Sequence, residues 1–159
     1  MDKHELIQAL CSALEEEIAR ATETAQRARE GAVHEEARPE NDKDTRALES
    51  SYLARGQAQR VVDLQIALKQ VRFMEVQSFD ADTAIGISAL VHLEAEGESR
   101  WVFLAPAAGG RRLQLGATGV DVLTPEAPLG RALIGRCQGE EIVLRTAGRS
   151  REYEISDVR

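Results

Sequence analysis

HEEARPENDKD, residues 34–44, separates two long apolar repeats and decides how the first half of the chain folds. It holds Pro39, the single proline of residues 1–74. The residue before a proline is pushed out of helical geometry, so a helix seldom continues through such a position. We therefore expect the chain to reverse here and to form an antiparallel hairpin of two helices.

The segments on either side of this reversal repeat apolar residues every three or four positions, which is the spacing of a coiled coil. Before it the repeat is Ile7, Leu10, Leu14, Ile18, Ala21, Ala25, Ala28 and Ala32; after it, Ala47, Ser51, Ala54, Ala58, Val61, Leu64, Leu68 and Val71. Small residues face small residues near the reversal, so we expect the arms to approach closely there. Arms of roughly 30 residues would each be about 45 Å long.

The reversal is also acidic. Residues 34–44 have a net charge of −3, because five acids, Glu35, Glu36, Glu40, Asp42 and Asp44, outnumber Arg38 and Lys43. The arms outside this tip are neutral. A charge run is commonly a solvated turn, but carboxylates that converge are also the ligands that Mg²⁺ prefers. The more specific hypothesis is a narrow rod that carries carboxylates into a confined place.

Composition changes near residue 75. Residues 1–74 contain only two glycines, whereas ten glycines and three prolines follow, among runs of β-branched residues. The sequence thus predicts an α+β fold, with a helical hairpin over 1–74 and a small strand-rich domain over 75–159. Strands are expected at 83–94, 99–105, 120–124, 140–146 and 151–158, with a short helix after Pro128. We expect the core to include Trp101, Phe103, Leu133 and Tyr153.

Charge and hydropathy exclude several functional classes. The 159 residues carry a net charge of −7, which argues against free nucleic acid as the primary ligand. No stretch reaches the roughly 18 apolar residues of a membrane span, and the acidic N-terminus lacks the apolar core of a signal peptide. We therefore expect a cytoplasmic protein without a membrane partner.

VLTPEAPLGRALIGRCQGEEIVLRTAGRSREYEISDVR, residues 122–159, resembles the C-terminal domain of the bacterial Gre transcript-cleavage factors, the GreA/GreB family. The family's pattern is a strand, a turn with Ser-Pro, a short helix and two further strands. The residues that match are Pro128, Leu129, Arg131, Leu133, Ile134, Gly135, Gly139, Glu141, Val143, Gly148 and Tyr153. The hairpin matches the family in architecture and loosely in sequence, at AREG (28–31) and QRVVDLQIAL (59–68).

The resemblance implies an FKBP-like C-terminal domain that docks at the outer rim of the secondary channel of RNA polymerase. The docking turn would be Glu126, Ala127, Pro128 and Leu129, where Ala127 replaces the family's serine. The hairpin would enter the channel, where acids at its tip help to hold a Mg²⁺ ion beside the polymerase's own aspartates. Such a factor is no enzyme itself, binds no cofactor tightly, meets nucleic acid only through the polymerase, and is expected to be a monomer.

The tip departs from the family's cleavage-active pattern, D-x-x-E-N-A-E-Y. Counted from AREG, the pattern's glutamate falls on Glu36 and its aspartate on Val33; counted back from QRVVDLQIAL, they fall on Lys43 and Glu40. The alternate acids Glu40, Asp42 and Asp44, in a turn expected to be non-helical, remain the candidate metal ligands. Two mechanisms stay open: the tip lends a ligand to a shared Mg²⁺, or it only blocks the channel and inhibits without cleavage.

Two other classes were weighed. A peptidyl-prolyl isomerase of the FKBP type needs an aromatic-lined pocket, and aromatic residues are only 4% of this chain. A coiled-coil chaperone or dimerisation rod would favour an apolar hairpin tip, whereas this tip is acidic. Co-purification with polymerase, against self-association or client binding, discriminates these classes.

Overall fold

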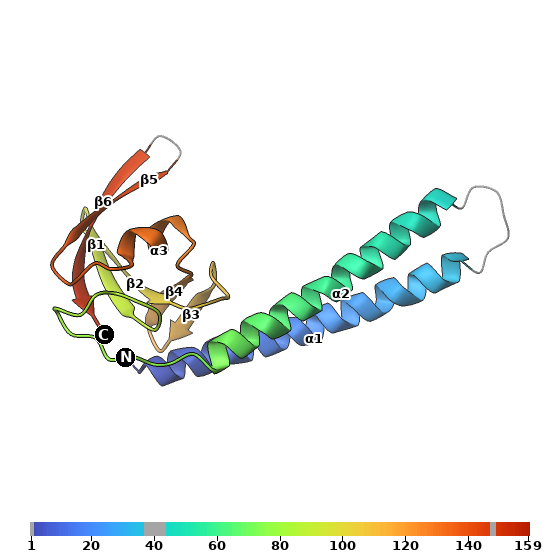
Figure 1. The fold of residues 1–159 in the computed structure, drawn as a ribbon, viewed down its shortest axis with the longest axis horizontal. Coiled ribbons are helices and arrows are strands. Elements are labelled where there is room, and N and C mark those ends of the chain that lie inside the picture. Colours follow the sequence, from blue (N-terminus) through green and yellow to red (C-terminus); the bar gives the residue numbers. More distant parts are fainter. Residues whose placement is uncertain (1, 37–43, 147–148) are drawn as a thin grey trace. The chain divides into compact units, whose positions relative to one another are not determined.

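The computed structural model describes residues 2–36, 44–146 and 149–159, in an α+β fold (Figure 1). Two long helices, α1 (Lys3–Glu36) and α2 (Asp44–Arg72), precede a small domain that contains a six-stranded sheet and helix α3 (Pro128–Leu133). The predicted fold class is therefore confirmed. In the parts of the chain that the structure describes, no helix combines the length and the apolar character needed to cross a bilayer.

The chain forms two compact units, and each helix of the hairpin contributes to both. One unit is Ser12–Lys69, the greater part of the paired helices. The other is Met1–Cys11 with Gln70–Arg159, so the beginning of α1 and the end of α2 belong with the sheet.

The paired helices bury the repeat that the sequence predicts for α1. Within Ser12–Lys69, Leu14 is fully buried and Ala21 nearly so, and the two helices are joined by an ion pair of 2.9 Å between Glu17 and Arg60. On α2 the predicted repeat is wrong at two positions, because Ser51 and Ala58 are exposed. The seam instead follows Ser50, Ala54, Gln57, Val61 and Leu68, which are half-buried, with Leu64 and Val71 buried; Ala67 beside it is also half-buried. The seam residues are spaced regularly by four and three residues. Alanine and serine occur on every face here, so they mark the interface poorly.

Small residues line a groove in the half of the hairpin toward the tip. An open groove of about 470 Å³ lies in this half of the hairpin, lined by Thr22, Ala25, Gln26, Arg29, Ala54, Ala58 and Val61. The separation of packed helices depends on the side chains at their contact. Alanine side chains at Ala25, Ala54 and Ala58 leave this part of the surface hollowed.

The sheet is mixed. Its strands are β1 (Leu90–Ala95), β2 (Glu98–Leu104), β3 (Arg112–Leu115), β4 (Thr118–Leu123), β5 (Glu141–Thr146) and β6 (Arg149–Val158). They lie in the order β3-β4-β2-β1-β6-β5, and every pair is antiparallel except β2 with β4. The hairpins β1–β2 and β5–β6 follow the prediction, whereas β3 was not predicted.

The strand predicted over 83–94 begins only at Leu90. The backbone before Leu90 makes hydrogen bonds that do not follow a strand pattern. The Ile85 amide donates to the Arg136 carbonyl at 2.7 Å, and the Ser88 amide donates to the Leu104 carbonyl at 2.8 Å. Ser88 is fully buried and has a positive φ of 69°, which is incompatible with a strand. These backbone hydrogen bonds therefore hold the segment before Leu90 against Arg136 and Leu104, although the segment is not a strand of the sheet.

Helix α3 covers one face of the sheet. The core on this face comprises Ile85, Ala89, Val91, Leu93, Ala95, Val102, Leu104, Leu129, Leu133, Ile142, Tyr153, Ile155 and Val158. Leu133 and Tyr153 were predicted here correctly, and Phe103 is fully buried on the opposite face. Trp101 is only half-buried, and its ring lies 4.5 Å from the ring of His92, so the prediction of a core tryptophan is wrong.

The second face of the sheet is buried as well. Leu90, Phe103, Val120 and Val122 share this face by their register and are inaccessible to solvent. Leu6, Leu10 and Val71, at the base of the helical hairpin, are fully buried in the same compact unit. The ends of α1 and α2 thus belong to the same compact unit as this apolar face, which must be covered. We infer that the base of the hairpin covers this face of the sheet.

Gly130 sets how closely α3 approaches the end of β4. A Cβ atom at this position would lie 2.0 Å from the carbonyl oxygen of Thr124, far inside van der Waals contact. We expect Gly130→Ala to lower the free energy of unfolding by about 1–3 kcal/mol, the usual cost of overpacking. Gly86→Ala, in the same unit with open space around it, is the control and should change stability little. Denaturant melts that rank the two variants equally would contradict this account.

Candidate functional site

The turn between β4 and α3 is the part of the predicted docking site that the structure describes. The Ala127 amide donates to the Thr124 carbonyl at 3.0 Å, and the Arg131 amide donates to the Ala127 carbonyl at 2.9 Å. Ala127 has extended backbone angles, φ −65° and ψ 146°, as the residue before a helix usually does. Pro128 follows as the first helical residue, where its missing N–H costs nothing.

This turn exposes two of the four predicted docking residues. Glu126 and Pro128 are exposed, and Ala127 is half-buried. The surface available to a partner is therefore a carboxylate beside a rigid apolar ring.

Leu129 corrects one expectation. A docking role for Leu129, one of the four predicted docking residues, requires an exposed side chain. Its side chain is only 4% exposed and belongs to the core under α3. An aspartate there would place a carboxylate among apolar side chains, at a high cost in stability. Leu129 thus anchors the turn from below, because a short helix must bury its apolar residues to remain folded.

The start of α3 lacks a side-chain cap. Ala127 makes no capping hydrogen bond, whereas a serine in this backbone conformation would offer its hydroxyl to a free amide of the first turn. Ala127, whose side chain has no hydrogen-bonding atom, cannot supply this interaction.

The tip residues lie largely outside the described residues. Glu40 and Asp42 fall in the gap at 37–43, and the side chains of Glu36 and Asp44 are likewise not described. Glu36 ends α1 and Asp44 begins α2. The expectation that Asp44 belongs to a non-helical turn is thus wrong. The role of Glu40, Asp42 and Asp44 as metal ligands stays a prediction, and so does Glu36 as a candidate tip acid.

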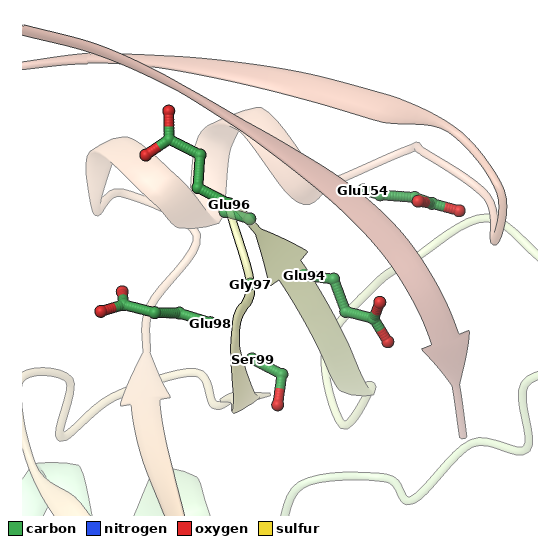
Figure 2. Close-up of a pocket in the computed structure, with 7 residues that line it drawn as sticks. Glu94, Glu96, Gly97, Glu98, Ser99 and Glu154 are labelled. Atoms are coloured by element: carbon green, nitrogen blue, oxygen red, sulfur yellow. The ribbon is translucent and has the colours of Figure 1, made fainter.

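A second acidic group surrounds the β1–β2 turn. Its members are Glu94, Glu96, Glu98 and Glu154 (Figure 2). The carboxylates of Glu96 and Glu98 point away from those of Glu94 and Glu154, so they do not converge as metal ligands would. Accordingly, the described residues contain no group of three side chains placed to hold a metal ion.

The outer face of α2 carries exposed apolar side chains that the sequence analysis missed. Leu48, Tyr52, Leu53, Val62 and Ile66 are between 45% and 68% exposed. Apolar residues thus lie on the interface and away from it, which is unusual for a solvent-exposed helix. The signal was available, because Leu48, Tyr52, Val62 and Ile66 lie outside the heptad seam.

No family model matches the chain, and no match is found among the curated proteins. Among solved structures, the transcription factor Gfh1 is 21% identical with a TM-score of 0.41, over 94% of this chain and 93% of that one. GreA factor homolog 1 (Gfh1) of Thermus thermophilus is 18% identical with a TM-score of 0.39, over 95% of each chain. The transcription elongation factor GreA/GreB from Nitrosomonas europaea is 21% identical with a TM-score of 0.36, over 62% of this chain and 78% of that one. These names are those of the family that residues 122–159 resemble.

The uncapped start of α3 generates a prediction. Ala127→Ser should raise the free energy of unfolding by about 1 kcal/mol, because its hydroxyl would accept a hydrogen bond from an otherwise free amide. Chemical denaturation measures the change, and Ala127→Val, which adds bulk without an acceptor, is the control. Equal stability of the serine and valine variants would show that the cap does not form.

Proposed function

We propose that this chain is a Gre-like regulator of transcription elongation that binds RNA polymerase. The observation that carries the proposal is the pattern of residues 122–159, whose members have definite structural roles. Pro128 starts α3, Leu133 and Tyr153 lie in the core, and Gly135 and Gly139 adopt positive φ angles of 81° and 82°. Positive φ is the conformation for which glycine is the default residue. The matched residues are therefore ones that the fold of the domain requires. In the sequence they come after a long helical hairpin, which is the order of parts in the Gre family.

In this proposal residues 75–159 form an FKBP-like docking domain. The turn at Glu126, Ala127 and Pro128 meets the rim of the polymerase's secondary channel. What supports this is the exposure of Glu126 and Pro128 on a turn that Leu129 holds rigidly from the core. A rigid exposed turn loses little conformational entropy when it docks.

Residues 1–74 supply the part that enters the channel. Helices of 34 and 29 residues correspond to lengths of about 50 and 45 Å. The apolar side chains on the outer face of α2 support an arm that meets a protein wall, because exposed apolar groups commonly mark contact surfaces. The acidic tip would then approach the polymerase's active centre.

At the tip, two mechanisms lead to opposite activities. Glu40, Asp42 and Asp44 have the oxygen ligands that suit Mg²⁺, so they would hold an ion shared with the polymerase. When bound, such an ion supplies Lewis-acid activation of the water that hydrolyses backtracked RNA. Lys43 opposes this role, because an ammonium among the ligands repels a cation. We therefore propose that the tip acts chiefly by occupying the channel, as a modulator with weak or no cleavage activity.

Of the two alternative functions, chaperone and peptidyl-prolyl isomerase, the structure offers an observation in favour of the first. The exposed apolar face of α2 would also suit a coiled-coil chaperone, which should then bind unfolded clients in the absence of polymerase. A peptidyl-prolyl isomerase gains none, because a hollow on the α3 side of the sheet is lined mainly by charged residues around a single Tyr153.

Docking is tested by reversing one charge. Glu126→Arg should weaken binding to core RNA polymerase at least severalfold, with an unchanged melting temperature, because its side chain is exposed. Glu152→Arg, an equally drastic change at an exposed position on β6, serves as the control and should bind normally. Equal affinities of both variants and the wild type, measured by biolayer interferometry, would remove the turn from the interface.

The tip mechanism is tested in stalled, backtracked polymerase complexes. If the tip only occupies the channel, Asp42→Asn and Asp44→Asn should leave inhibition nearly unaltered, because occupancy depends on reach. A photo-crosslinker at position 40 should label the polymerase near its active centre. Mg²⁺-dependent RNA cleavage by the wild type, lost in either asparagine variant while binding persists, would overturn channel occupation in favour of a shared metal.

A further inference from the structure

A hollow of about 450 Å³ on the α3 side of the sheet has no role in the proposed function. It is lined by Glu98, Ser99, Arg100, Arg112, Asp121, Arg151 and Tyr153, which come from β2, β3, β4 and β6. Three of these residues are arginines, in a protein whose net charge is −7. A local concentration of guanidinium groups in an acidic protein calls for a physical explanation.

Two of the arginines are held by the same aromatic ring. The guanidinium carbons of Arg100 and Arg151 lie over Tyr153, at 5.7 and 5.4 Å from the ring centroid. Tyr153 itself is only 5% exposed, so it forms a fixed floor. The Nε atoms of both arginines are buried without a hydrogen-bond partner. Because an unpaired buried donor is costly, a ligand acceptor that reaches Nε after a shift of the arginine side chain would stabilise this arrangement.

The third arginine is accommodated by a glycine. A Cβ atom at Gly119 would lie 2.8 Å from both Nε and Nη2 of Arg112, so the Arg112 guanidinium rests where any other residue would place its side chain. Gly119 lies within β4 and has no positive φ that would require glycine. We attribute the glycine to the space that Arg112 needs on the surface of the sheet.

The two carboxylates of the hollow, Asp121 and Glu98, leave many N–H donors of the three arginines without a close acceptor. Asp121 is 3.9 Å from Nε of Arg100 and 3.8 Å from Nη1 of Arg112, beyond hydrogen-bond distance in both cases. Glu98 pairs with Arg151, and the hydrogen bond from that guanidinium lowers the pKa of the Glu98 carboxyl. Glu98 lies at the start of β2, with its side chain 76% exposed, so an incoming anion can displace it.

We propose that this hollow is a binding site for a phosphate-type oxyanion, with Arg100, Arg112 and Arg151 as its ligands. Guanidinium groups match phosphate oxygens in geometry and charge. Two singly charged carboxylates at the rim already fail to satisfy the three arginines. A tetrahedral, multiply charged group presents more acceptors to them at once. The proposal is independent of polymerase binding, and its test needs no polymerase.

The test is a titration of the full-length chain with inorganic pyrophosphate, followed by isothermal calorimetry and by NMR of the arginine Nε–H groups. We expect saturable binding with shifts of the Arg100 and Arg151 signals. Arg112→Gln, at a side chain that is 72% exposed, should weaken binding about tenfold or more without unfolding. Gly119→Ala should weaken it too, by displacing the Arg112 guanidinium with no change in charge. Arg27→Gln, an exposed arginine on α1, is the control and should bind like the wild type.

Three outcomes would overturn the proposal: no saturable binding by the wild type, unchanged affinity in both Arg112→Gln and Gly119→Ala, or citrate binding as tightly as pyrophosphate. A parallel titration with a nucleoside triphosphate identifies the source of the phosphate. Tighter binding than pyrophosphate, with the same loss in Arg112→Gln, supports the site as one for a nucleotide. Equal binding supports it as one for the free oxyanion.

Discussion

Full burial of Leu6, Leu10 and Val71 is the interaction on which the rest of this structure depends. These residues belong to the long helices, yet they lie in the compact unit that contains the sheet. Apolar residues also occupy the sheet face opposite α3, at Leu90, Phe103, Val120 and Val122, so that face must be covered. We infer that the first turns of α1 and the last turn of α2, which belong to this unit, provide the cover.

Beyond its base the hairpin has much less apolar surface to bury. Toward the tip its seam consists of Ala21, Ala25, Ala28 and Ala32, opposite Ala54 and Ser50, and an open groove remains at the level of Ala25 and Ala54. Because burial of apolar area is the main stabilising contribution in a protein, this half should open more easily than the base. In the proposed function the hairpin would enter a narrow channel of the polymerase, where a protein wall would cover the apolar side chains of α2.

The α3 side of the sheet combines two kinds of surface. Under α3 the core is apolar, and Leu129 with Leu133 secures the helix so that Glu126 and Pro128 stand exposed on a rigid turn. Beyond α3 the same face carries arginines that are stacked on Tyr153 and unsatisfied at two nitrogen atoms. Neighbouring strands thus present a carboxylate-bearing turn and a guanidinium-lined hollow, which are chemically suited to different ligands.

The sequence by itself determined the helices and strands that a short stretch of residues specifies through its spacing or its prolines. The three-and-four spacing from Ile7 to Ala32 predicted the buried side of α1, Pro128 predicted the start of α3, and alternation predicted the β5–β6 hairpin. The reversal predicted at Pro39 lies outside the described residues. The sequence could not locate β3, the irregular path of 83–89, or the true seam at Ser50 and Gln57, because short or small-residue segments have no distinctive period. Only the tertiary structure decided that Leu129 is buried, that Arg112 rests on Gly119, and that both faces of the sheet are buried. Each of these depends on contacts between residues distant in the chain, and a periodic pattern shows that a face is apolar without showing what covers it.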